Sequence, residues 1–254
     1  MHLKQIRLFL LLFCLAFMPL TAICDPAPSP GAAQTDPRAR ALAQRVLDSM
    51  GGRKAWDGTR YLAWTFNDQY QIWDKKKNRF RWERDSLVAI IDTQTKDGKV
   101  YVKGQELEDP EEKQKLLDRA YALYINNSYW LVMPFKLLDP GVTLKYVAED
   151  TTMDNAEADV LEMSFDAVGL TPQNKYMVWV DKQQGLVSQW AFFRKSTDEA
   201  PTFTRRWSGY KDYGKIKLAS DRSNPQSDFE LFHIASPRSV PEKVFNSPTP
   251  VDKL

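Results

Sequence analysis

Apolar side chains at every second position are the feature that most constrains the fold of this chain. Such runs occupy residues 62–66, 70–72, 80–82, 88–90 and 100–102, and again 142–146, 161–165, 176–180, 186–193, 203–207, 216–218 and 229–234. A period of two places the apolar side chains on one face of a β-strand. Short polar turns separate the runs, so the spacing predicts many strands that pair in sequence as antiparallel neighbours.

Two segments have the sequence pattern of amphipathic helices. Asp36–Pro37 fits a helix start, because aspartate caps free N–H groups and proline fits the first turn, and Gly51–Gly52 ends this helix. Asp109–Pro110 predicts the start of a second helix. The apolar stripe of the second helix comprises Leu117, Ala120, Tyr121 and Tyr124.

The segment 129–138 is too apolar for an exposed loop, and Pro134 interrupts it. It is expected to be either a lid that moves when a ligand enters or a fixed plug that completes the core. The fold class that we predict is α+β, mainly β. It is a single antiparallel meander curled into a half-open β-barrel, with an N-terminal helix and an inserted helix plus apolar lid segment. A sheet of so many strands usually curls or closes.

The first 24 residues have the layout of a secretory signal peptide: Lys4 and Arg7, then an apolar run, then small residues before Asp25. We expect a flexible leader over 25–36, the half-barrel domain over 37–235 and a polar, proline-containing tail over 236–254. The mature chain would be periplasmic, and lipidation of Cys24 is the alternative that would anchor it to a membrane. No later stretch reaches the roughly 18 apolar residues of a transmembrane helix.

Removal of the leader changes the chemistry that is open to the protein. Taking 24 residues from 254 leaves 230, with 33 basic and 33 acidic residues, no cysteine and His233 as the one histidine. Thiol chemistry, a structural zinc site and multi-histidine metal sites are therefore excluded. A neutral chain also lacks the net basic face of a nucleic-acid binder. We expect a monomer without metal or cofactor.

Three stretches resemble a known group of proteins. They are Tyr129–Gly141, then Val160–Trp190 with its Gly169-Leu170-Thr171-Pro172 motif, and Trp207–Gly214. Together they are similar to an uncharacterised family (a domain of unknown function) of exported bacterial proteins, over about Pro37 to Ile234. That family in turn resembles the LolA/LolB-type lipoprotein carriers. The resemblance implies a half-barrel of antiparallel strands with helices over it, and a concave apolar cavity that shields acyl chains.

Large aromatic side chains are the best positive signal for a site, because apolar and aromatic walls are typical of hydrophobic-ligand pockets. For any one of them ordinary core is the more common role, because large residues that alternate along strands are usually core. Arg79 and Arg81 alternate with the aromatic residues of their strand and could hold a lipid headgroup, although such arginines are more often solvated. The ligand-binding candidates are Trp64, Phe80, Trp82, Tyr101, Trp130, Met133, Phe135, Trp179, Trp190, Phe192, Arg79 and Arg81.

These observations predict a non-catalytic carrier or binding protein for a lipid, an acyl chain or a lipoprotein. An envelope scaffold that uses edge strands or the tail is one alternative. A hydrolase that uses two carboxylates is the other. The acidic residues between Glu149 and Asp159 lack the spacing of a calcium loop and fit a solvated hairpin. His233 fits a strand position at the edge of the core.

Overall fold

The computed structural model describes residues 35–166 and 170–254. The described helices are α1 (Pro37–Ser49), α2 (Gly52–Gly58) and α3 (Pro110–Val132), with two short 3₁₀ helices, η2 (Met133–Lys136) and η3 (Glu242–Phe245). The first strands are β1 (Tyr61–Phe66), β2 (Gln69–Asp74), β3 (Arg79–Arg84), β4 (Leu87–Asp92), β5 (Gly98–Val102) and β6 (Gln105–Glu106). The strands after α3 are β7 (Val142–Thr151), β8 (Glu157–Phe165), β9 (Lys175–Asp181), β10 (Val187–Phe193), β11 (Phe203–Arg206), β12 (Ser208–Tyr213), β13 (Ile216–Asp221) and β14 (Leu231–Ala235).

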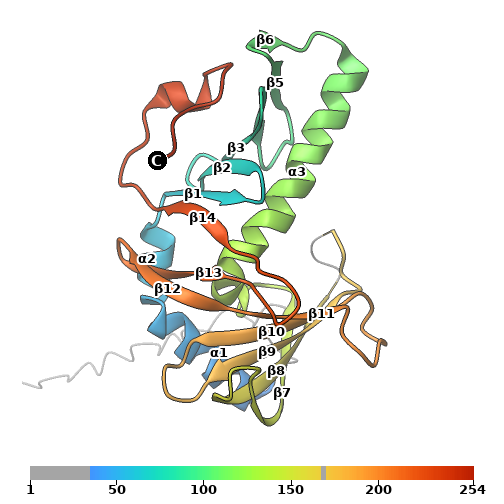
Figure 1. Cartoon of the computed structure of the whole chain (residues 1–254), viewed down its shortest axis with the longest axis vertical. Helices are drawn as coiled ribbons and strands as arrows, with labels where there is room; N and C mark the ends of the chain where they lie inside the picture. Colours follow the sequence, from blue (N-terminus) through green and yellow to red (C-terminus); the bar gives the residue numbers. More distant parts are fainter. Residues whose placement is uncertain (1–34, 167–169) are drawn as a thin grey trace, which may run out of the picture.

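The strands form antiparallel sheets that do not close into a barrel, so the predicted mainly β, half-open α+β fold is confirmed. The meander is divided among three sheets. A seven-stranded sheet has the order β14-β1-β2-β3-β4-β5-β6, a five-stranded sheet the order β11-β10-β9-β8-β7, and β12 and β13 form a ribbon. Helix α3 comes between β6 and β7 in the chain, where the strands of the first large sheet give way to those of the second (Figure 1).

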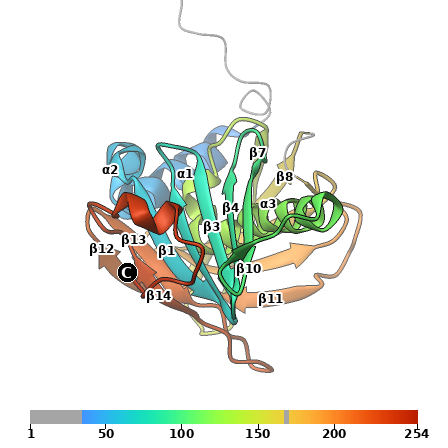
Figure 2. The same ribbon diagram turned by 90° about the horizontal axis from the view of Figure 1, so that it is seen from above.

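Helix α3 crosses the molecule and packs against β4, β5 and β13 (Figures 1 and 2). One apolar core joins both large sheets and all three α-helices. The inner faces of β1, β2 and β3 contribute large residues to it, among them Trp64, Phe80 and Trp82, which are all fully buried. The curved sheets thus enclose a helix, as expected for a half-open barrel.

Both predicted helix starts are confirmed. The Asp36 side chain accepts a hydrogen bond from the Ala39 N–H at 2.7 Å and so caps α1. The Asp109 side chain caps α3 by accepting one from the Glu112 N–H at 2.8 Å. The first helix ends at Ser49, but a short second helix, α2, follows Gly51 directly. The Cβ that a larger residue would carry at Gly51 would lie 2.2 Å from the Lys215 carbonyl oxygen. Glycine therefore allows the β12–β13 hairpin to contact the junction of α1 and α2.

The segment 129–138, which we expected to be a separate apolar segment after the second helix, is itself largely helical. Helix α3 continues to Val132, and η2 follows it without a break. Pro134 lies in the first turn of η2, where its missing N–H costs no hydrogen bond, so it ends one helix and begins the next. Met133 and Phe135 are buried in the main core.

The segment 236–254, which we expected to be a polar tail, packs partly on the domain. It contains η3, and Val244 and Phe245 are buried against Tyr61 and Ile72 on the outer face of the seven-stranded sheet. The tail lies beside this sheet in Figure 2.

The predicted signal peptide, most of the leader and Gly169 lie outside the described residues. Among the residues that are described, no helix is long and apolar enough to cross a membrane.

Candidate functional site: an aromatic cavity

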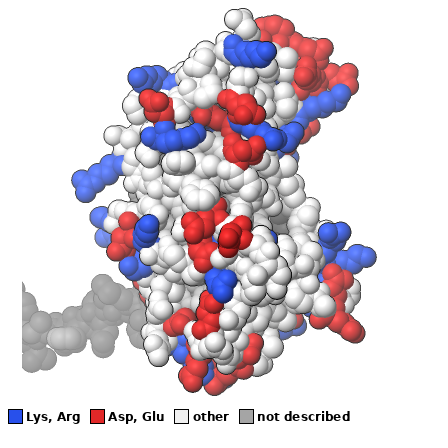
Figure 3. All heavy atoms as spheres, in the orientation of Figure 1, with Lys and Arg blue, Asp and Glu red and all other residues white. Residues whose placement is uncertain are grey.

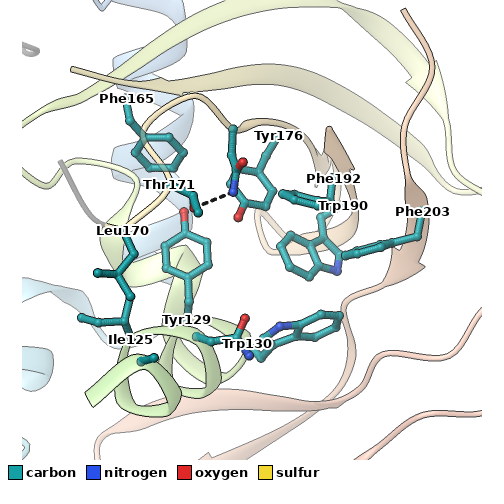
Figure 4. A pocket seen from close by; sticks show the side chains of 13 residues that line it. Ile125, Tyr129, Trp130, Phe165, Leu170, Thr171, Tyr176, Trp190, Phe192 and Phe203 are labelled. Carbon is teal, nitrogen blue, oxygen red and sulfur yellow. Dashed lines mark hydrogen bonds between the residues drawn. The ribbon is translucent and has the colours of Figure 1, made fainter. Parts of the chain in front are cut away.

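An apolar cavity of about 450 Å³ lies between the C-terminal half of α3 and the five-stranded sheet (Figure 4). This volume is within the range of small-molecule sites, roughly 300–1,000 Å³. Seven of its thirteen lining residues are aromatic. The full lining is Ala122, Ile125, Asn126, Tyr129, Trp130, Phe165, Leu170, Thr171, Asn174, Tyr176, Trp190, Phe192 and Phe203.

Helix α3 builds one wall of the cavity by its own periodicity. Ile125 and Tyr129 are four residues apart and so lie on one face of the helix, with Trp130 beside them. Strand register builds the opposite wall, because Tyr176 on β9 and Phe203 on β11 are the direct cross-strand partners of Phe192 on β10. Figure 4 shows these side chains directed from the two walls toward a common space.

Ring contacts fix the walls relative to each other. Trp130 contacts Trp190 edge-to-face, with ring centroids 4.8 Å apart, and stacks on Phe203 at 5.6 Å. Tyr176 stacks on Trp190, with centroids 5.3 Å apart and an interplanar angle of 9°. Such pairs stabilise by about 0.5–1.5 kcal/mol each beyond their burial. The cavity is therefore held open by a network of rings that already pack on one another.

The cavity carries no charge at neutral pH. None of its lining residues is acidic or basic. Burial raises the pKa of Tyr176 to about 12 and the pKa of Tyr129 well above its usual range, so both phenols stay protonated. Polar groups are few: the Asn174 amide donates to the Thr171 hydroxyl at 2.6 Å. The Trp190 indole N–H is buried and has no hydrogen-bond acceptor among the described residues.

Arg222, which follows β13, holds the end of α3 in place. Its guanidinium is fully buried and donates two hydrogen bonds to the Trp130 carbonyl, at 3.2 and 2.8 Å, and others to the carbonyls of Asp221 and Ala219. The Trp130 carbonyl is one of the last in α3, where a cation also suits the helix dipole. Burial lowers the pKa of Arg222 to about 9, so the group stays charged at neutral pH. Arg222 therefore fixes the backbone of a cavity residue.

The structure distributes the predicted site residues among several places. Trp130, Trp190 and Phe192 line the cavity. Five other predicted residues are buried in the main core and do not line the cavity: Trp64, Phe80, Trp82, Met133 and Phe135. Tyr101 on β5 and Trp179 on β9 alternate with core residues. Each therefore lies on the face of its strand that is turned away from the main core.

The two predicted arginines do not line the cavity either. Arg79 lies in ion pairs with Asp74 and Glu242. Arg81 is fully buried beneath the C-terminal tail, where it donates to three backbone carbonyls and to Glu83. Both point to the outer face of β3, because they alternate with the inward Phe80 and Trp82.

The sequence-based candidates did not include Tyr129 on the helix wall, or Tyr176 and Phe203 on the strand wall. Tyr129 would follow from its spacing to Ile125 once α3 is extended past residue 128. Tyr176 and Phe203 stand out only when the register of β9, β10 and β11 is known.

The other groups considered from the sequence have structural partners. His233 adopts a positive φ of 49° at a bulge, and its Nδ1 lies 2.9 Å from the Thr65 hydroxyl. In the acidic segment, Asp159 pairs with Arg38 and Asp154 with Arg206. Within residues 35–166 and 170–254, no group of three histidine, cysteine or acidic side chains could hold a metal ion.

Fold and cavity together define a mainly β protein with a half-open arrangement of antiparallel sheets and an uncharged aromatic cavity. A scan against family models gave no match, and a search of curated proteins gave none either. Among solved structures, the chain is similar to the crystal structure of a DUF1329 family protein from Desulfovibrio piger. The sequence identity is 10%, the TM-score is 0.45, and the alignment covers 83% of this chain and 98% of that one. At these values the similarity says nothing about function, and the resemblance to lipoprotein carriers stays a prediction.

Proposed function

We propose that this protein binds an uncharged hydrophobic ligand, such as a lipid or an acyl chain, in the aromatic cavity, and that it acts as a non-catalytic carrier or binding protein. The observation that carries the proposal is the cavity itself: about 450 Å³, mostly aromatic, and without a charged side chain in its lining. Burial of hydrocarbon there would contribute up to ~0.8 kcal/mol per CH₂ group.

The alternatives gain no support from particular residues. A carboxylate-based hydrolase needs two acids about 5–10 Å apart beside the substrate, and no acid lines this cavity. A scaffold that uses the tail would need the tail to be accessible, whereas residues such as Val244 and Phe245 are buried against the sheet. We further propose, from the leader sequence, that the carrier acts after export to the periplasm.

Native mass spectrometry after gentle purification tests this function. Ala122 is exposed and lines the cavity, so it lies at the opening, and Ala122→Trp should block entry without disturbing the core. Gln114→Trp, on an exposed part of the same helix, is the matched control. We expect a co-purified lipid-sized mass with the wild type and the control, and its loss with Ala122→Trp. A clean apo mass for all three, with no binding of added lipids, would reject the proposal.

A further inference from the structure

A second hollow, with four basic residues among the eleven that line it, shares no residue with the aromatic cavity. It has a volume of about 830 Å³ and is bounded by α2, by the tip of the β12–β13 hairpin and by the chain that follows β14. Its basic side chains are Lys54, Arg60, Lys215 and Arg238, and no acidic residue lines it. We call this hollow the basic groove.

Three of the four cations have no partner. Lys54, Lys215 and Arg238 are exposed and make no ion pair or hydrogen bond within the described part of the chain. Arg60 is different, because its guanidinium binds both carboxylate oxygens of Asp74 at 3.0 Å. The three unpaired cations of the groove are therefore free to bind an anion, whereas Arg60 is already engaged by Asp74.

Each wall of the groove is held in position by backbone contacts. The Lys217 N–H donates to the Met50 carbonyl at 3.0 Å, and the Lys215 carbonyl packs against Gly51, so the hairpin tip is fixed beside α2. Strand β14 ends at Ala235, which pairs with Ala63 on β1, and this pairing places Arg238 only three residues beyond the sheet. The cations therefore come together because of the fold and not through flexible side chains alone.

Charge explains what such a groove would bind. A cleft lined by charges of one sign concentrates the electrostatic field and raises the local concentration of ligands of the opposite charge. In Figure 3, several basic side chains lie along the side of the molecule where Figure 1 draws α2 and the hairpin tip, with acidic side chains among them. Lysine binds phosphate as a point charge and arginine binds it through two donors. The mature chain would have equal numbers of acids and bases, so this concentration is local and not a consequence of net charge.

We propose that the basic groove is a binding site for a phosphate group, held by Lys54, Lys215 and Arg238 and bordered by Arg60. The phosphate belongs either to a lipid headgroup at a membrane surface or to a soluble phosphorylated compound. The site is independent of the aromatic cavity, so that either proposal can fail while the other stands.

Two titrations of the full-length mature protein at low ionic strength distinguish the sources. The first adds inorganic phosphate and follows binding by calorimetry. The second uses cosedimentation with phosphatidylcholine vesicles that contain phosphatidylglycerol, and with pure phosphatidylcholine vesicles for comparison. Binding of phosphate alone indicates a soluble ligand, and selective binding to the anionic vesicles indicates a headgroup.

Charge-matched variants then locate the binding. The triple variant Lys54→Gln, Lys215→Gln, Arg238→Gln should lose at least about tenfold in affinity, because membrane-surface cations act roughly additively. The control removes three exposed lysines outside the groove, Lys76, Lys195 and Lys211, and should change affinity by less than about twofold. Equal melting temperatures would show that both variants fold.

The proposal is overturned if neither phosphate nor anionic vesicles bind, or if binding is equal on neutral vesicles. It is also overturned if the control variant loses as much affinity as the groove variant, since the effect would then come from overall charge.

Discussion

Arg81 offers the sharpest test of how the tail is held. Its side chain is fully buried and donates to the carbonyls of Val244 at 2.9 Å, Ser247 at 2.8 Å and Thr249 at 2.6 Å. It also forms an ion pair of 2.6 Å with Glu83, which is 3% exposed. One cation therefore links the outer face of β3 to three backbone groups of the tail.

We expect Arg81→Met to lower the free energy of unfolding by about 3–5 kcal/mol, because it leaves a buried carboxylate without its counter-charge. The three tail carbonyls lose a donor at the same time. The double variant Arg81→Met, Glu83→Gln removes the stranded charge and should recover at least about 1 kcal/mol. Arg84→Met is the matched control, since Arg84 pairs with Asp68 on the surface, and it should cost less than about 1 kcal/mol.

The assay is denaturant-induced unfolding, combined with amide hydrogen exchange at two positions in the tail. The Val251 N–H donates to Glu83 and the Leu254 N–H donates to the Tyr70 hydroxyl, so both should lose protection in Arg81→Met. A cost below about 1 kcal/mol with unchanged protection at both amides would refute this account of the tail.

Three further variants and titrations test other parts of the structure. Arg222→Met should destabilise by roughly 2–4 kcal/mol and weaken ligand binding, because the Trp130 carbonyl loses its donors; unchanged unfolding would contradict the capping role. Burial lowers the pKa of Lys75 to about 8, so the folded state binds its proton less tightly than the unfolded state does. Stability from this group should therefore rise with pH from about 8 to 10.5, and an NMR titration of its amine with a midpoint near 10.5 would contradict this. Gly51→Ala should cost at least about 3 kcal/mol in thermal unfolding, since its φ is +111° and a Cβ would also meet the Lys215 carbonyl. Gly52→Ala has a φ of +82° but open space around it, so it should cost only the backbone strain, about 1–2 kcal/mol; equal costs would argue against the clash.

Local chemistry was sufficient to predict several elements. An aspartate followed by proline marks the start of α1 and of α3, because capping and the first helical turn depend only on neighbouring residues. Period-two alternation likewise identified the strands that carry Trp64 and Trp82 as apolar on one face.

Contacts distant in sequence explain what the sequence could not predict. Arg81 stands on the polar face of its strand, and nothing local shows that residues more than 160 positions later cover that face. The cavity could not be predicted for the same reason. Phe203 pairs with Phe192 because of the register of β10 and β11, and nine residues connect these two strands. Trp179 and Trp190 both lie on strands, and only the strand register shows that Trp190 lines the cavity and Trp179 does not.

Tryptophan fluorescence during titration with an uncharged hydrophobic ligand is the most direct test of the aromatic cavity as a binding site. Trp130 lines the cavity, whereas Trp179 lies on the opposite face of its strand and donates to Asp150. We expect a saturable change in emission that persists in Trp179→Phe and is reduced in Trp130→Phe. A change that disappears in Trp179→Phe and persists in full in Trp130→Phe would contradict it, as would the absence of any response to neutral lipids.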